Sequence, residues 1–251
     1  MNKKISFVCP TLNRKTLQTR LTDSIFQNAC NPDDVEIIFG INDDDPVALE
    51  TSNELKKKYG VHSIKVKIVS PDEKLANISN LCSEEAAGDI IGNIADDVVV
   101  ESKNWDLTVI EEFSKYPDGI LLLWSDCGLW NGTLAAHYFI HKNWIKTLGH
   151  IQPTFFYADW TDHWNQTLAT RIGRAKLITD KNRLFLRHLH AEFGHMEKDD
   201  TYWKVKAKRE RNVEEGLTFH NPTPEMEKAF SEQLNKLKDY IDEYYEEQND
   251  D

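Results

Sequence analysis

Short apolar runs alternate with segments of helical periodicity through the first hundred residues. The apolar runs predict four β-strands, which are Ile5–Cys9, Val35–Ile41, Ile64–Val69 and Ile90–Ile94. The intervening segments predict three helices, which are Thr16–Ala29, Ala48–Tyr59 and Leu75–Ala87. Gly60 and Gly88 follow the second and third helices and are expected to act as C-caps. This alternation predicts an α/β fold with parallel strands joined by right-handed crossovers.

The second half of the chain has a less regular pattern. It predicts helices at Leu107–Lys115, at about 143–148 and at Asp159–Ile172. It predicts further strands at Gly119–Trp124, Ala136–Ile140, Lys176–Ile178 and Leu184–His190. The segment Ala191–Trp203 contains glycine and mixed charges, so it is interpreted as a mobile loop.

A long helix is predicted from Pro224 to near the C-terminus. Its apolar positions follow a 4-3-4-3 rhythm: Phe230, Leu234, Leu237, Ile241 and Tyr244. We therefore divide the chain into a main domain, residues 1–222, and an acidic amphipathic C-terminal helix, residues 223–251. The stripe is expected to pack on the main domain, and a homodimer through this helix is the alternative.

Composition narrows the class of protein. A chain of 251 residues suits one large domain, and no stretch approaches the roughly 20 apolar residues of a membrane span. The four cysteines are widely spaced, which favours a reducing, cytoplasmic setting. The net charge of −12 disfavours broad nucleic-acid binding.

Three polar clusters follow the predicted parallel strands. They are Pro10–Arg14, Asn42–Asp45 and Asp96-Asp97. In open sheets of this kind, ligands bind beyond the carboxyl ends of the strands. The three clusters are therefore expected to converge on one ligand site.

The first cluster carries a family resemblance. The stretch from Ile5 to Arg14 resembles the opening strand and loop of family 2 glycosyltransferases, and residues 80–88 resemble the helix that leads into the family's metal-binding strand. The resemblance implies a GT-A fold, with a Rossmann-like, mostly parallel central sheet flanked by helices and followed by a C-terminal helical extension. It also implies donor-nucleotide contacts from Pro10, Thr11, Asn13, Arg14, Asp43, Asn80 and Asp96.

The acidic pair after the fourth strand is the expected metal site. Asp97 matches the last aspartate of the family's Asp-x-Asp motif, whereas Ala95 stands where the first should be. Carboxylates suit Mn²⁺ or Mg²⁺, which would bridge the donor phosphates. Adjacent strand residues face opposite ways, so Asp97 is assigned to the metal and Asp96 to the ribose. The alternative is an Asp-Asp turn without a ligand.

A second motif, Phe155 to Trp164, is similar to the segment below the acceptor site in the same family. The resemblance implies that Asp159 is the general base of an inverting transferase, with Asp162 in reserve, although Ala158 replaces the usual glutamate. A carboxylate at a helix N-terminus is stabilised as the anion and can accept a hydroxyl proton. A simple N-cap is the alternative role for Asp159.

Two later segments complete the expected site. Strand alternation places His188 and His190 on one face, a spacing suited to metal ligation, and His190 is the preferred ligand. The segment after them resembles the family's donor loop, in which Lys198 would contact the diphosphate and Tyr202 would stack on the sugar or base. A solvated charged loop is the alternative for Lys198.

These features predict a metal-dependent, inverting glycosyltransferase that moves a sugar from a nucleoside-diphosphate sugar, expected to be a UDP-sugar, to an acceptor hydroxyl. A stand-alone bacterial or phage enzyme fits the resemblance, with the host cytoplasm as its place if phage-encoded. The alternatives are a nucleotidyltransferase, an inactive nucleotide-sugar binding module, and a phage-type enzyme that glycosylates a modified DNA base through the basic run Lys204–Arg211.

Overall fold

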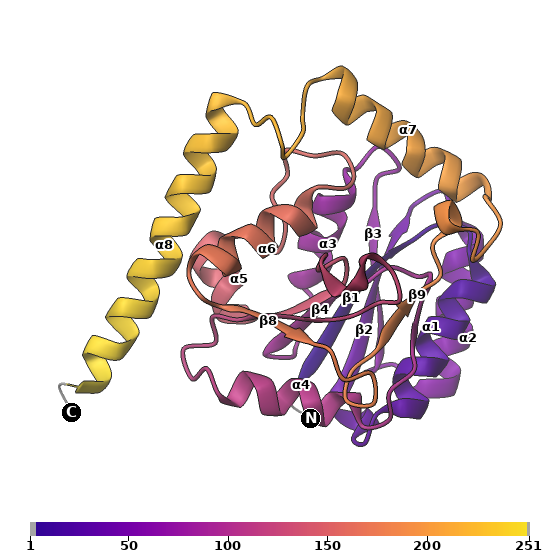
Figure 1. Cartoon of the computed structure of the whole chain (residues 1–251). Helices are drawn as coiled ribbons and strands as arrows, with labels where there is room; N and C mark the ends of the chain where they lie inside the picture. Colours follow the sequence, from indigo (N-terminus) through magenta and orange to yellow (C-terminus); the bar gives the residue numbers. More distant parts are fainter. Residues whose placement is uncertain (1–3, 250–251) are drawn as a thin grey trace.

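The computed structural model describes residues 4–249 and is built on a seven-stranded mixed sheet (Figure 1). The strand order is β3-β2-β1-β4-β7-β6-β8. Residues 1–3, at the start of the predicted main domain, and residues 250–251, at the end of the predicted C-terminal helix, lie outside the described residues. The strands of this sheet are β1 (Ile5–Thr11), β2 (Val35–Asn42), β3 (Ile64–Val69), β4 (Ile90–Asn93), β6 (Leu122–Ser125), β7 (Tyr138–His141) and β8 (Ala175–Ile178).

Most of the sheet is parallel, as the sequence predicts. The strand β1 pairs in parallel with β2 and with β4, and β2 pairs in parallel with β3. The strand β7 lies between β4 and β6 and is antiparallel to both. Because β1, β2 and β4 run the same way, their polar carboxyl-end loops meet at one edge of the sheet.

Helices cover both faces of the sheet (Figure 1). Alternation along β1 sends Phe7 and Cys9 into one apolar core and Val8 into the other. The first core contains residues of α1 (Lys15–Asn28), α2 (Pro46–Tyr59) and α4 (Trp105–Ser114). The second contains residues of α3 (Leu75–Ser83), α5 (Lys142–Leu148), α6 (Thr161–Arg171) and α8 (Pro224–Asn249). The chain thus forms an α/β/α sandwich.

Two predicted helix boundaries are wrong for physical reasons. The helix α3 ends at Ser83 rather than at Ala87, and Gly88 is not its cap. Gly88 instead lies against β1, where its backbone N–H donates to Ser6 Oγ at 2.8 Å and a Cβ would come within 2.8 Å of that oxygen. The helix α6 begins at Thr161 because Asp159 and Trp160 have left-handed backbone angles. By contrast, Gly60 ends α2 with φ +97°, as predicted.

The predicted mobile loop Ala191–Trp203 is wrong in its second part. A short 3₁₀ turn, η3 (Ala191–Phe193), is followed by α7 (Asp200–Glu214), a helix that the apolar periodicity does not reveal. The Asp199 side chain caps α7 by accepting a hydrogen bond from the Tyr202 backbone N–H at 2.8 Å. Figure 1 shows α7 on the outside of the molecule, at the top of the view.

A small ribbon lies beside the main sheet. The strands β5 (Val98–Val100) and β9 (Leu186–His188) pair antiparallel, with Val98 opposite His188. The remaining elements are the 3₁₀ turns η1 (Pro32–Asp34) and η2 (Trp130–Gly132). The ribbon matters because its register brings the segment after β4 to the segment that carries the late histidines.

The apolar stripe of the C-terminal helix packs on the rest of the chain. Leu237 and Met226 are almost wholly buried, and α8 contacts both α5 and α6. The predicted packing on the main domain is confirmed, whereas the homodimer and the boundary at residue 222 remain predictions. Within residues 4–249, no helix combines the length and apolar character needed to cross a membrane.

Candidate active site

A cavity of about 760 Å³ opens at the carboxyl ends of β1, β2 and β4. Its walls come from the loops after these strands, from α7, and from the segment before α6. The predicted site residues that line it are Pro10, Thr11, Arg14, Asp96, Asp97, Asp159, Asp162, His188, His190 and Tyr202. Most of the predicted site therefore converges on one cavity, although the residues come from the whole length of the chain.

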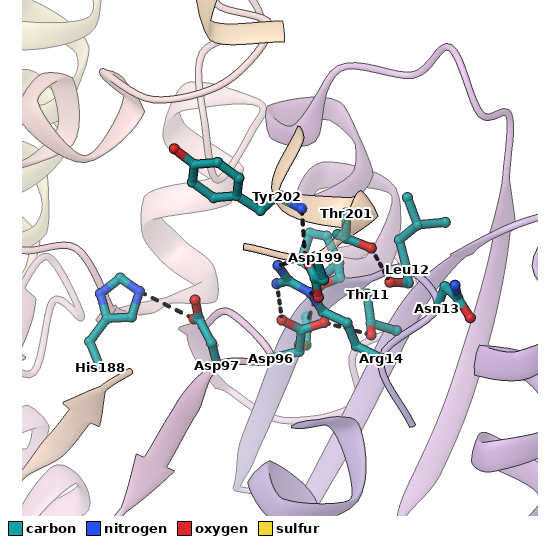
Figure 2. A network of polar contacts seen from close by, with 12 residues as sticks. Thr11, Leu12, Asn13, Arg14, Asp96, Asp97, His188, Asp199, Thr201 and Tyr202 are labelled. Carbon is teal, nitrogen blue, oxygen red and sulfur yellow. Dashed lines mark hydrogen bonds and ion pairs between the residues drawn. The ribbon is translucent and has the colours of Figure 1, made fainter. Parts of the chain in front are cut away.

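A network of polar side chains around Arg14 lies at the side of the cavity that the predicted nucleotide loop forms (Figure 2). Thr11 Oγ1 donates to Asp96 Oδ2 at 2.8 Å, and Arg14 donates to Asp96 Oδ1 at 2.9 Å. The same guanidinium makes a bidentate contact with Asp199, at 2.8 and 2.9 Å. The Arg14 side chain is only 11 % exposed and that of Asp96 only 4 %. Two carboxylates thus hold one buried arginine in a fixed position.

The network ties the first helix of the fold to α7. Asp199 caps α7, and Thr201 Oγ1 donates to the Leu12 carbonyl oxygen at 2.6 Å. Figure 2 shows these contacts beside Arg14, at the N-terminal end of α7. The loop expected to cradle the nucleotide is therefore held from both sides.

The segment after β4 places Asp97 opposite His188, with 3.2 Å between Asp97 Oδ1 and His188 Nε2 (Figure 2). The two groups attract as charges but are poorly aligned for a hydrogen bond. Asp97 Oδ1 therefore has no well-directed hydrogen-bond donor among the described residues. Burial alone would lower the pKa of His188, but the close polar contacts and charges of Asp97 and Cys127 raise that pKa to about 9. Burial opposes ionisation of Asp97 too, yet His188 holds its pKa below the usual range. An ion pair is the favoured state.

The residues around Asp97 do not form a resident metal site. Among residues 4–249, no group of three or more histidine, cysteine, aspartate or glutamate side chains is arranged to hold a metal ion. Both oxygens of Asp96 are used by Thr11 and Arg14, and Ala95 offers no ligand. His190, the preferred ligand in the sequence, turns its Nδ1 to the Glu192 backbone N–H at 3.1 Å. Of the Asp96-Asp97 pair, only Asp97 keeps an oxygen without a hydrogen-bond partner among the described residues.

The candidate base, Asp159, lines the same cavity. Asp159 accepts from Arg209 Nε at 3.0 Å through one oxygen and lies 2.9 Å from it through the other. The cavity walls desolvate the carboxyl and raise its pKa; Arg209 lowers it and Asp162 raises it further. Because 45 % of the side chain remains exposed, the rise is smaller than full burial would cause. Asp159 is therefore a carboxylate of raised basicity held by a cation from α7.

Backbone strain concentrates at this cavity. Six described residues other than glycine have positive φ, and three of them are asparagines, which tolerate it. The other three are Trp130, Asp159 and Trp160, and all three line the cavity. Aspartate tolerates a left-handed conformation as asparagine does, whereas this conformation costs each of the two tryptophans about 1–2 kcal/mol. Strain of this kind persists where the surroundings enforce it, often at functional sites.

Asp162, the reserve base, sits in the first turn of α6. It lies 2.9 Å from His163 Nδ1 and accepts the His163 backbone N–H at 2.8 Å. That contact raises the pKa of His163. Asp162 thus holds a partner on its own helix, whereas Asp159 holds Arg209 on α7.

Four predicted site residues do not line the cavity: Asn13, Asp43, Asn80 and Lys198. Asn80 is used for structure, because its Oδ1 accepts the backbone N–H groups of Ile151 and Gln152, each at 2.9 Å. Asp43 is exposed, and the buried carboxylate of that loop is Asp45, which caps α2. Their nucleotide contacts remain predictions.

The donor-loop residues Lys198 and Tyr202 are linked through one glutamate. Lys198 lies 3.2 Å from Glu192, and the Tyr202 hydroxyl donates to that same carboxylate. Lys198 is exposed, whereas Tyr202 is buried and lines the cavity. The contacts predicted for them with the diphosphate and with the sugar or base are not tested by this arrangement.

Three contributors escape the sequence reasoning: His137, Trp130 and Arg209. His137 is buried, and its ring centroid lies 4.6 Å from that of His188. Trp130 has no neighbouring motif that marks it. The basic run Lys204–Arg211 was the available signal for Arg209, because helical spacing turns Lys204, Lys208 and Arg209 of that run towards the cavity.

The comparisons show the fold of the chain. No family model matches it, and no curated protein matches it. Among solved structures, a mannosyltransferase from Pyrobaculum calidifontis, in complex with GDP-Man and Mn²⁺, superposes with a TM-score of 0.60 and 11% identity over 94% of this chain and 70% of the other.

A second similar structure is TarS of S. aureus. The whole TarS chain gives a TM-score of 0.58 at 13% identity over 82% of this chain, which spans only 39% of the TarS length. TarS residues 1–349 with UDP give 0.57 at 11% identity, over 97% of this chain and 91% of that one. The chain has the GT-A fold, as the resemblance implied.

Proposed function

We propose that the protein is a glycosyltransferase that moves a sugar from a nucleoside-diphosphate sugar to an acceptor hydroxyl. The observation that carries the proposal is one cavity in which the predicted nucleotide loop, the Asp96-Asp97 pair and the carboxylate Asp159 meet. The fold adds support, because a structure similar to it is a mannosyltransferase with GDP-Man and another, TarS, holds UDP. A UDP-sugar is the proposed donor.

The proposed chemistry needs one base and one stabilised leaving group. The acceptor oxygen attacks the anomeric carbon while Asp159 takes its proton, and the bond to the diphosphate oxygen breaks with its electron pair. Attack opposite the leaving group inverts the anomeric centre. The raised pKa of Asp159 supports this role, since a base closer to neutral pH is a better proton acceptor.

Side chains of this chain can stabilise the charge on the leaving diphosphate. Lys204, Lys208 and Arg209 line the cavity from α7. Burial lowers the pKa of Lys208, whose Nζ donates to the Glu73 carbonyl oxygen. Preorganised cations near a developing anion lower the barrier more than mobile ones do. The helix α7 is thus proposed to serve both the base and the leaving group.

Metal use is proposed in a reduced form. Mn²⁺ or Mg²⁺ would neutralise phosphate charge, and Asp97 is the carboxylate that would hold it together with donor oxygens. An arriving cation must compete with the His188 imidazolium for Asp97. We therefore propose that a metal ion stimulates sugar transfer only weakly. The fold is proposed not to require the metal.

An inactive binding module is the second candidate, because Arg209 Nε contacts both oxygens of the proposed base. The discriminating observation is turnover. A module of this kind would bind a nucleotide sugar but release no nucleoside diphosphate from it.

A thermal-shift screen tests the proposal. The chain is heated with UDP, GDP, CDP, ADP and their common sugar derivatives, each with and without Mn²⁺. A ligand that binds only the native state raises the melting temperature, by an amount that grows with concentration above Kd. We expect one nucleotide class to raise it, and a flat response to all of them would contradict the proposal.

A further inference from the structure

A second cavity, of about 550 Å³, lies beside the candidate active site. The two share three lining residues, Trp130, Leu134 and His163, so they adjoin each other. The second cavity then follows the exposed side of α6 over Gln166, Thr167, Thr170 and Arg171, and it also includes Thr133. We refer to it as the α6 groove.

The α6 groove has a fixed aromatic wall. Trp130 stands at the junction of the two cavities with φ +52°, a conformation that a tryptophan rarely adopts. The turn that carries it is held by Trp124 Nε1, which donates to the Gly132 carbonyl oxygen at 2.9 Å, and by Thr133 Oγ1, which donates to the Trp130 carbonyl oxygen at 2.6 Å. The backbone is thus held in a costly conformation that keeps this indole at the junction.

Neighbouring rings fix the orientation of that indole. Its centroid lies 5.5 Å from the Phe193 ring at 89°, 6.1 Å from His190 at 82°, and 6.0 Å from His188. These edge-to-face contacts order the side chain without covering it, since Trp130 still lines both cavities. A rigid aromatic surface in the wall of the candidate active site is a platform for a ring with an apolar face.

The rest of the groove is neutral and rich in hydroxyls. Gln166 is fixed, because its Nε2 donates to the Thr133 carbonyl oxygen at 2.8 Å and its Oε1 accepts the Ala135 N–H at 2.9 Å. Thr167 and Thr170 line the same wall, and the Thr170 hydroxyl donates to the Gln166 carbonyl oxygen at 2.7 Å. Arg171 is the one cation among the described lining residues. A nucleic acid would need several cations here, and the chain carries a net charge of −12.

From this geometry we infer that the α6 groove binds the acceptor, that the acceptor is a carbohydrate, and that one of its pyranose rings stacks on Trp130. The inference rests on the proposed function, because it uses Asp159 as the group that the acceptor hydroxyl must reach. A sugar ring at the junction presents hydroxyls to both cavities, so one hydroxyl faces the donor while the remaining residues of the glycan follow α6. Neutral threonine and glutamine side chains suit sugar hydroxyls.

Saturation-transfer NMR tests this inference on the full chain. The probes are methyl pyranosides and trisaccharides of glucose, galactose, mannose and N-acetylglucosamine, with a short single-stranded oligonucleotide for contrast. Each is added to the chain in the presence of the nucleotide that the thermal screen identifies. Four variants are compared with the native chain: Trp130→Ala, Trp130→Phe, Thr167→Trp and Thr167→Ser.

We expect saturation of at least one pyranose probe by the native chain, and a loss of affinity of about tenfold or more in Trp130→Ala and in Thr167→Trp, which fills the groove from α6. Trp130→Phe and Thr167→Ser, which keep a ring and a hydroxyl, should remain within about threefold of native affinity. The nucleotide affinity should not change in the two Thr167 variants, because Thr167 lines the α6 groove and not the candidate active site.

Three results would overturn the inference: no saccharide binds while the nucleotide does, a saccharide binds all variants equally, or the oligonucleotide replaces the saccharides and is lost in the same variants. Absence of nucleotide binding would instead contradict the proposed function. The two failures are therefore distinct.

Discussion

The two sides of the active-site cavity are built in opposite ways. On the proposed donor side, Thr11, Arg14, Asp96 and Asp199 bind one another, and none of the four has a positive φ. On the acceptor side, Trp130, Asp159 and Trp160 have left-handed backbones. We interpret the proposed donor side as a rigid frame, whereas the proposed acceptor side holds two tryptophans in a costly backbone conformation.

The largest expected effect is at the strained side. Asp159→Asn keeps the size of the side chain and tolerates positive φ, but it removes the proton acceptor. We expect the transfer rate to fall by about a thousandfold, within the usual range for loss of a general base, while nucleotide affinity stays within about threefold. Product formation under single-turnover conditions measures the first, and calorimetry the second. Retained transfer would remove Asp159 from the base role.

The next effect is expected at the frame. Arg14→Ala would leave buried Asp96 without its cation, so the free energy of unfolding should fall by about 3 kcal/mol. In Arg14→Lys, which keeps the charge but loses the bidentate contact with Asp199, the free energy of unfolding should fall by less. Urea denaturation of both variants measures the difference. Equal, small losses would show that the frame is not a stabilising network.

A smaller effect is expected where the two sides meet on α7. Arg209 lowers the pKa of Asp159, so Arg209→Gln should raise it further. Transfer requires the ionised carboxylate; hence the acidic limb of the rate profile should move to higher pH. Arg209→Lys should stay closer to the native profile. An unmoved limb in Arg209→Gln would show that Arg209 acts elsewhere, for example on the leaving group alone.

The smallest effect concerns the His188–Asp97 pair and stability. The folded pKa of His188 is about 9, above the ordinary value of about 6.5. The stabilisation is therefore complete below about pH 6.5 and is lost as pH rises through 9. We expect the melting temperature to fall by a few degrees more between pH 6 and 9.5 in the native chain than in His188→Gln. Parallel pH curves would contradict the ion pair.

The strand–helix alternation of the first hundred residues predicts β1 to β4 and the convergence of their polar ends. That half follows from local periodicity, because each parallel strand and helix has its own apolar pattern. The pairing of Asp97 with His188, in place of His190, depends on the register of β5 and β9, which no local pattern determines. The same is true of Trp130, whose conformation is imposed by tertiary contacts such as the Trp124–Gly132 hydrogen bond.

Surface helices were harder to predict than buried ones. The helix α7 is mostly charged, so it lacks an apolar stripe, and its position depends on Asp199 and on contacts with Arg14. Asp159 was predicted from a motif, but its position before α6, held by Arg209, was not. Sequence reasoning thus predicted carboxylates that line the cavity and missed the cation that holds one of them.

One measurement tests the central claim most directly: calorimetric titration of the nucleoside diphosphate identified by the thermal screen into two groove-filling variants. Asn42 lines the donor end of the cavity and Thr167 lines the α6 groove, so Asn42→Trp and Thr167→Trp place the same bulk at opposite ends. If the donor occupies the strand ends, one molecule binds the native chain and Thr167→Trp with equal affinity, and Asn42→Trp loses binding at least about tenfold. Equal affinity for Asn42→Trp and the native chain, with both variants folded, would contradict the account.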